Sequence, residues 1–343
     1  MFTNLVHNNE RQADLLIISD LFERIGDKFL PILSNLPKNS DRLALNFAMF
    51  VTELYAAKST DMNCNSTTMV YFEYLYCLFF FSNLKCDYLL EPYLNFLFIV
   101  FDKIEKDKFN FLVEKGCVSK LGCWLLELIE KGKHKAYCFM IMTNITCLRD
   151  GEADKMFDDW KFFELVAKEI VTAEYCELLF QDLLQIMLNL LDDCDEFVVY
   201  FIKNEAMVNR LLDIMYEHRE TRLFIMIFDI FNHIAQFYKE SADIIFFFIE
   251  YYYIIDIVIP KIQDKNFKES YLMDIAFFID TLINIGVTYD NDYKGDGINI
   301  FIDQIETSKE IDKGLNFIFD TKSKELCDVY QVLIDRIEKL RSK

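Results

Sequence analysis

Apolar residues along this chain recur three or four positions apart, which is the spacing of α-helices. The clearest stretch runs from Leu112 to Asn144. It predicts one helix that ends near Gly116, a second over residues 118–129 and a third over residues 136–146. We expect Gly116 to adopt the left-handed conformation that ends many helices. The third helix is almost wholly apolar around Asn144, which predicts burial on most sides.

The same type of helix, apolar with a central Asn, recurs along the chain. Asn144, Asn189, Asn232 and Asn284 follow one another at intervals of 45, 43 and 52 residues. A period in the low forties is typical of armadillo and HEAT repeats, in which stacked helical units share one continuous core. The sequence therefore predicts an all-α fold, specifically a right-handed superhelical solenoid of armadillo/HEAT-type repeats.

We predict one solenoid over residues 1–343. Residues 1–111 would hold degenerate amino-terminal repeats, because the positions one and two periods before Asn144, near Phe98 and Leu54, carry no Asn. Residues 112–297 would hold the clearer repeats, and residues 298–343 a carboxy-terminal capping repeat.

The most apolar run of the chain extends from Ile244 to Ile259. Glu250 and Asp256 interrupt it, and it is shorter than the ~18–20 apolar residues that a bilayer-spanning helix needs. We therefore expect buried helices around Pro260 and no membrane segment.

Composition supports a helical protein and limits the classes of partner that it could bind. The chain is 53% hydrophobic and has only 9 Gly and 4 Pro, too few for the many tight turns of an all-β fold. Its net charge of −20 argues against sequence-independent nucleic-acid binding, which needs a basic face. It permits a basic partner, although the acidic surface could equally serve only for solubility.

The remaining sequence features argue against secretion and against enzymatic chemistry. The 10 Cys include no Cys-x-x-Cys pair, and residues 1–15 lack a hydrophobic run, so we expect reduced thiols and a cytoplasmic and nuclear location. The four His have no partner at metal-ligand spacing, and no phosphate-binding glycine loop or nucleophile elbow is present. We expect no cofactor, no metal and no enzymatic activity.

The carboxy-terminal segment from Ile298 to Leu340 resembles the final armadillo repeat of importin-α. The matching positions, in order, are Asn299-Ile300, Ile305-Glu306, Ile311-Asp312-Lys313, Asn316-Phe317-Ile318, Tyr330 and Ile337-Glu338-Lys339. The helices that read MTNIT, MLNLL, FNHIA and LINIG are similar to that family's Ala-Leu-Ser-Asn-Ile-Ala third helices. The resemblance covers roughly residues 112–340.

This resemblance implies an adaptor that recognises basic nuclear-localisation peptides in an acidic concave groove lined by the third helices. The Asn side chains would bond to the peptide backbone, and neighbouring carboxylates would pair with Lys or Arg. An importin-β-like carrier would be a further partner, without direct contact to nucleic acid or membrane. The predicted peptide-binding residues are Asn144, Asn189, Asp192, Asp193, Phe228, Asp229, Asn232, Asp280 and Asn284.

Two features of the family pattern are missing. The family places a Trp one turn before each groove Asn, but here those positions are Met140, Gln185, Phe228 and Asp280, so only Phe228 could stack on a lysine stem. Residues 1–45 also lack the basic arm that binds importin-β. The alternative is an armadillo scaffold that binds another peptide or a permanent protein partner. A separate alternative for each Asn is a purely structural role, in which its side chain bonds only to the backbone of the neighbouring repeat.

Overall fold

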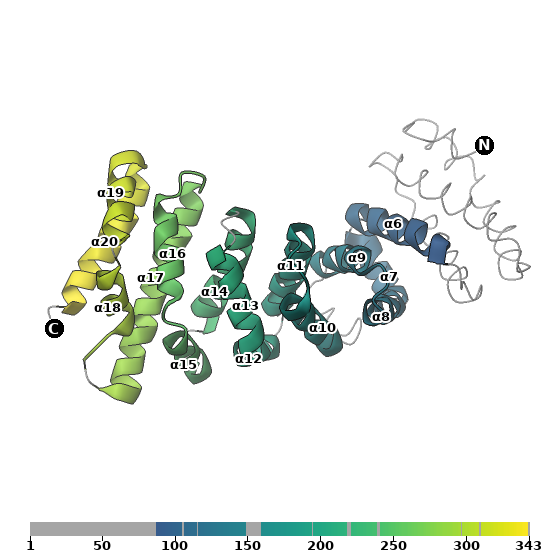
Figure 1. Ribbon diagram of the computed structural model, residues 1–343, viewed down its shortest axis with the longest axis horizontal. Helices are drawn as coiled ribbons and strands as arrows, with labels where there is room; N and C mark the ends of the chain where they lie inside the picture. Colours follow the sequence, from purple (N-terminus) through teal and green to yellow (C-terminus); the bar gives the residue numbers. More distant parts are fainter. Residues whose placement is uncertain are drawn as a thin grey trace, which may run out of the picture. The chain divides into compact units, whose positions relative to one another are not determined.

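The computed structural model describes residues 87–104, 106–114, 116–148, 159–193, 195–217, 221–238, 241–295, 297–308 and 310–341. Over these residues the protein is an all-α helical repeat protein with no strand (Figure 1), which confirms the predicted fold class. The right-handed superhelical course of the solenoid remains a prediction. The degenerate repeats predicted before residue 87 lie outside the described residues.

The chain divides into two compact units, with the boundary between Phe162 and Phe163 inside α10 (Asp159–Thr172). The described part of the first unit holds α6 (Asp87–Lys103), α7 (Lys106–Glu114), α8 (Cys117–Glu130) and α9 (Lys135–Cys147). Helix α7 packs on α8, and both α8 and α6 pack on α9. The boundary falls within the segment for which we predicted the clearer repeats.

Helices α7 to α9 are the three helices predicted between residues 112 and 146. Gly116 separates the first two with φ 69°, and its backbone N–H donates to the Val113 carbonyl at 2.8 Å. Gly132, also at φ 69°, follows α8. In α9, Phe139, Ile141 and Met142 are fully buried. The left-handed glycine and the buried third helix are therefore both confirmed.

The second unit continues in the same pattern of short helices and long ones. Its elements after α10 are α11 (Glu177–Asp193), α12 (Asp195–Lys203), α13 (Glu205–Glu217), α14 (Thr221–Tyr238), α15 (Ala242–Glu250), α16 (Ile254–Val258), the 3₁₀ helix η1 (Ile259–Gln263), α17 (Glu269–Tyr289), the π-helical turn η2 (Asp290–Lys294), α18 (Ile300–Thr307), α19 (Ile311–Thr321) and α20 (Lys324–Arg341).

Four long helices, α11, α14, α17 and α20, pack in sequence order, α11 on α14, α14 on α17 and α17 on α20 (Figure 1). We call these four the third helices. The shorter helices lie between them in the chain and pack on them or on one another. Asn189, Asn232 and Asn284 lie on the first three of them.

Helix α17 is the centre of the second unit, because it contacts α14, α15, α18 and α20. Its Phe278 ring lies 5.3 Å from Phe228 and 6.1 Å from Phe248, and the buried Tyr330 hydroxyl of α20 donates to the Leu272 carbonyl at 2.9 Å. Among the described residues, the segment Glu269–Lys294 is long and apolar enough to cross a membrane, with a mean hydropathy of 1.4. Half of that apolar window is buried inside the structure.

The apolar run around Pro260 forms short helices, as predicted. It comprises α15, a turn, α16 and η1, and Pro260 lies in the first turn of η1, where a missing N–H costs nothing. Ile244, Ile255 and Ile259 are buried, whereas Glu250 and Asp256 are exposed. The segment predicted as the capping repeat holds α18, α19 and α20, of which α19 packs on η1.

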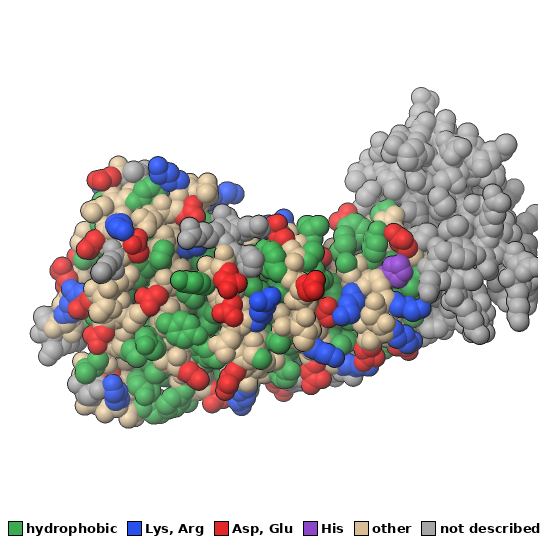
Figure 2. All heavy atoms as spheres, viewed as in Figure 1, with side chains coloured by type: hydrophobic (Ala, Val, Ile, Leu, Met, Phe, Trp, Pro, Cys, Tyr) green, Lys and Arg blue, Asp and Glu red, His purple; other side chains and the backbone are tan. Residues whose placement is uncertain are grey.

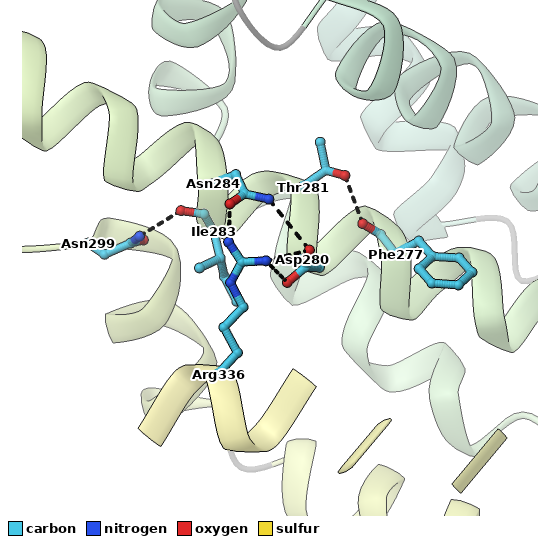
Figure 3. Close-up of polar contacts among 7 residues, drawn as sticks. All are labelled: Phe277, Asp280, Thr281, Ile283, Asn284, Asn299 and Arg336. Carbon is cyan, nitrogen blue, oxygen red and sulfur yellow. Dashed lines mark hydrogen bonds and ion pairs between the residues drawn. The ribbon is translucent and has the colours of Figure 1, made fainter. Parts of the chain in front are cut away.

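Asn299 fixes the start of α18 on α17. Its side-chain oxygen accepts from the backbone N–H groups of Phe301 and Ile302, and its Nδ2 donates to the Ile283 carbonyl at 2.8 Å (Figure 3). This close approach requires a glycine at position 286, because a Cβ there would overlap the Asn299 side chain, with its Cγ at 2.8 Å. We therefore expect substitutions at Gly286 and Asn299 to be energetically coupled.

We expect Gly286→Ala to lower the free energy of unfolding by about 1–3 kcal/mol, because the added methyl displaces the Asn299 cap. Urea unfolding measures this value. In an Asn299→Ala background the methyl has room, so Gly286→Ala should cost less there than in the native chain. Equal costs in both backgrounds would contradict the contact.

Candidate functional site

On α11, α14 and α17, neighbouring helices bury most of the surface, and one side carries polar residues that reach solvent. On α11, for example, Ile186, Met187 and Leu190 are fully buried. The solvent-facing residues follow the three- and four-residue spacing of one helix face. We define this third-helix face as Gln185, Asn189 and Asp192 on α11, Asp229, Asn232 and His233 on α14, and Asp274, Phe277, Asp280 and Asn284 on α17, none of which is buried.

Contacts across neighbouring helices join these residues into one surface. The Asp192 carboxylate of α11 lies 3.1 Å from His233 Nδ1 of α14. The charge of Asp274 on α17 acts on Asp229 of α14. The face therefore continues from α11 across α14 to α17.

On α17 the predicted residues Asp280 and Asn284 already hold a cation (Figure 3). Arg336 of α20 donates Nη1 to both Asp280 carboxylate oxygens, at 2.6 and 2.7 Å, and Nη2 to the Asn284 side-chain oxygen. Asn284 Nδ2 makes a long 3.5 Å contact to Asp280. About a third of each side chain of the Arg336–Asp280 ion pair is exposed. Charge-assisted bonds of this type are roughly twice as strong as neutral ones.

The Asn side chains of α11 and α14 bond to residues of their own helices. Gln185 Nε2 donates to the Asn189 side-chain oxygen at 2.9 Å, and Gln236 Nε2 donates to the Asn232 side-chain oxygen at 2.9 Å. In both cases the partner is one turn away on the same helix, and the bond uses the oxygen of the Asn. Such bonds orient the two amides on the partly exposed face.

Asp229 and Asp274 carry like charges on neighbouring helices. The pKa of Asp229 is raised to about 6, first because burial penalises its charge and second because the Asp274 carboxylate lies nearby. Burial also raises the pKa of Asp274. Neither carboxylate has a salt bridge to a described residue, so the pair is electrostatically uncompensated within the described part of the chain.

A cavity of about 490 Å³ lies beside Asp229. It is lined by Gln185 and Leu188 of α11, by Arg222, Ile225, Met226 and Asp229 of α14, and by Asn266, Phe267, Lys268 and Tyr271 before and at the start of α17. The apolar members could hold a hydrocarbon stem, and Asp229 offers a carboxylate at the same place.

Phe228 does not lie on this face. It is 2% exposed and packs between the Phe224 ring at 6.2 Å and the Phe278 ring at 5.3 Å, so it belongs to the core. The prediction that Phe228 stacks on a lysine stem is therefore not supported, because its helical position points inward. Among the described side chains of the third helices, the exposed rings are instead Phe277, 50% exposed, and Phe237, 72% exposed.

The sequence reasoning missed Phe277, although its spacing could have identified it. Phe277 precedes Asp280 by three residues and Asn284 by seven, which places all three on one helix face. The roles of Asp274 and Arg336 had no comparable signal, because each depends on a partner from another helix.

Two predicted residues cannot be placed on the third-helix face. Asn144 lies on α9 of the first unit, where its Nδ2 is buried without a hydrogen-bond partner among the described residues. The Asp193 side chain lies outside the described residues, whereas its neighbour Asp192 is exposed.

The acidic turn after α17 is capped internally. The Asp290 carboxylate accepts from the Gly297 backbone N–H at 2.9 and 3.1 Å, and the Asp290 carbonyl accepts from Gly295. Within the described residues, no group of three or more His, Cys, Asp or Glu is placed to hold a metal ion.

Comparison with known proteins identifies no family. A scan against protein-family models and a search of curated proteins both found no match. Among solved structures, the crystal structure of an engineered protein matches with a TM-score of 0.60, covering 98% of this chain and 83% of that one at 11% sequence identity. Similarity at that identity supports the fold alone.

We expect Asp229→Asn to stabilise the protein more at alkaline than at acidic pH. The folded pKa of about 6 exceeds the unfolded value of about 3.9, so the folded state binds more protons between these values and loses stability as the pH rises through them. The gain in unfolding free energy should be about 1 kcal/mol larger near pH 8 than near pH 5, as measured by urea unfolding.

Asp213→Asn serves as the control, because Asp213 is exposed on α13. Its effect should stay within about 0.5 kcal/mol at both pH values. A pH-independent effect of Asp229→Asn would contradict the burial of an ionised carboxyl at this position.

Proposed function

We propose that this protein is a non-enzymatic adaptor that binds an extended Lys/Arg-rich peptide along the third-helix face. The observation that carries this proposal is the contact of Arg336 with Asp280 and Asn284. It is an internal example of the interaction that the face would make with a peptide: a guanidinium held by a carboxylate and an amide one helical turn apart. Asp229 and Asn232 on α14 repeat these residue types three positions apart.

The charges on the face favour a basic ligand. Asp229 and Asp274 raise the electrostatic cost of folding when no cation is near, since burial and their mutual repulsion both disfavour the ionised forms. A Lys or Arg side chain placed between them would offset that cost. The net charge of −20 would also steer a basic peptide toward the protein.

Apolar surface next to these carboxylates would hold the stems of the basic side chains. Leu188, Ile225 and Met226 line the cavity beside Asp229, and the half-exposed Phe277 ring precedes Asp280 by one turn. Long basic side chains bury their methylene stems on such surface while the charged end reaches a carboxylate. Because Arg222 and Lys268 line the same cavity, we place the basic side chain near Asp229 and Asp274 rather than along the whole cavity.

The resemblance of residues 112–340 to importin-α suggests that this binding serves nuclear import. The ligands would then be nuclear-localisation-type peptides. The same resemblance leads us to propose armadillo repeats as the repeat type. Residues 1–45, where that family has its carrier-binding arm, lie outside the described residues, so pairing with an importin-β-like carrier rests on the resemblance alone.

The second candidate is a scaffold with a permanent apolar partner, and exposed aromatic residues favour it. The rings of Phe246 and Tyr293 are 5.0 Å apart, and Tyr289 lies 5.8 Å from Phe246. Phe246 and Tyr293 are 48% and 50% exposed. Figure 2 shows apolar side chains gathered over the part of the second unit where α15 and the end of α17 lie. Surfaces of this kind often mark protein contacts.

We expect the native protein to bind a fluorescently labelled Lys/Arg-rich peptide in an anisotropy assay, and Asp229→Asn with Asp274→Asn to weaken binding about tenfold or more. The reason is that each lost carboxylate removes a charge-assisted contact. Raising the salt concentration should also weaken native binding, because partly exposed charge pairs are screened.

The matched control is Asp213→Asn with Glu217→Gln, which removes the same charge from exposed positions of α13. It should leave binding within about twofold. An equal loss of peptide affinity in both double variants would mean that binding responds only to the net charge of the protein. Binding of an apolar peptide that is insensitive to salt would favour the scaffold.

A further inference from the structure

The carboxy-terminal end of the third-helix face is occupied by a residue of the chain itself. Arg336 comes from α20, more than 50 residues after Asp280, and reaches back to Asp280 and Asn284 on α17 (Figure 3). We infer that Arg336 determines peptide-length specificity: as an internal ligand, it closes this end of the face and excludes a further basic residue of a bound peptide. This inference rests on the proposed function.

The position of Arg336 is fixed by the core. It lies on α20 between Leu333 and Ile337, which are 5% and 8% exposed, and α20 is anchored to α17 by the bond from the buried Tyr330 hydroxyl to Leu272. The guanidinium is thus held near Asp280 at a high effective concentration, in the millimolar range or above for a tethered group. A single peptide side chain, which pays its own ordering cost, competes poorly with it.

The occupied end contrasts with the rest of the face. Both Asp280 carboxylate oxygens accept from Arg336 Nη1, whereas Asp229 and Asp274 have no salt bridge to a described residue. Asp192 is 64% exposed and lies 3.1 Å from His233 Nδ1. Basic residues of a peptide therefore have available carboxylates on α11, on α14 and on the first half of α17, but not at Asp280.

The geometry of packed helices gives the length of peptide involved. Neighbouring packed helices lie about 8–10 Å apart, and an extended chain covers about 3.3–3.6 Å per residue. A peptide that reached one further third helix would therefore be longer by about three residues. If Arg336 were absent, a peptide longer by three residues with an additional Arg would reach Asp280 and Asn284.

The test measures the binding of three labelled Lys/Arg-rich peptides to the native chain and to Arg336→Gln. One peptide is short, and two others extend it by three residues with an added Arg, one at each end, because either chain direction would be possible. Native protein should bind all three within about twofold. Arg336→Gln should bind one extended peptide about tenfold more tightly than the short one, the gain of one charge-assisted pair.

Two controls separate closure of the face from a general effect of removing a charge. Arg341→Gln removes another α20 arginine, which pairs with Glu306, and should leave the length preference unchanged. Adding Asp280→Asn to Arg336→Gln should abolish the gain, because the receptor carboxylate is then missing.

Circular dichroism melts confirm that each variant is folded at the assay temperature. If Arg336→Gln is not folded, Arg336→Lys should show a smaller length preference of the same sign, because it keeps the charge but loses the second nitrogen that contacts Asn284.

The outcomes distinguish this inference from the proposed function. Native binding without any length preference in Arg336→Gln would overturn the inference and leave the proposed function standing. No native binding, together with binding of an extended peptide by Arg336→Gln, would overturn the proposed function of the native face and support closure by Arg336. Absence of binding in both would overturn both, since Asp280 would then bind no external cation.

Discussion

The structure of the second unit depends on the packing of apolar third helices against one another. Residues such as Leu190, Phe231 and Leu282 are fully buried in α11, α14 and α17. Each fully buried aliphatic or aromatic side chain contributes about 1.5–3 kcal/mol relative to exposure. Because α14 and α17 are each covered by the preceding and the following third helix, only one strip of their surface remains for polar residues. The candidate site is the set of these strips.

That constraint concentrates carboxylates on neighbouring helices and creates an electrostatic cost. At one end the chain offsets the cost itself, since Arg336 binds Asp280. In the middle, Asp229 and Asp274 remain without a salt bridge to a described residue, and both pKa values rise. We therefore regard the middle of the third-helix face as the part that awaits a ligand, in keeping with the proposed binding of a basic peptide.

Aromatic residues of α14 and α17 are buried or exposed according to the side of the helix on which they lie. Phe228 points inward and packs on Phe278, whereas Phe277, on the neighbouring helix, is half-exposed beside Asp280. In the proposed binding of a basic peptide, Phe277 would supply part of the contact with the side-chain stems. The exposed cluster of Phe246 and Tyr293 lies on other elements, α15 and η2, and is the feature that the scaffold alternative would use.

The sequence by itself determined the helical fold, the breaks at Gly116 and Pro260, the buried third helices and the positions of Asn189, Asn232 and Asn284 on them. These features follow from local spacing and conformational preference, which each segment carries on its own. Tertiary structure decided which carboxylates are paired. The bond of Arg336 to Asp280, the repulsion between Asp229 and Asp274 and the packing of Phe228 on Phe278 each involve residues on different helices, which come together only when the helices pack.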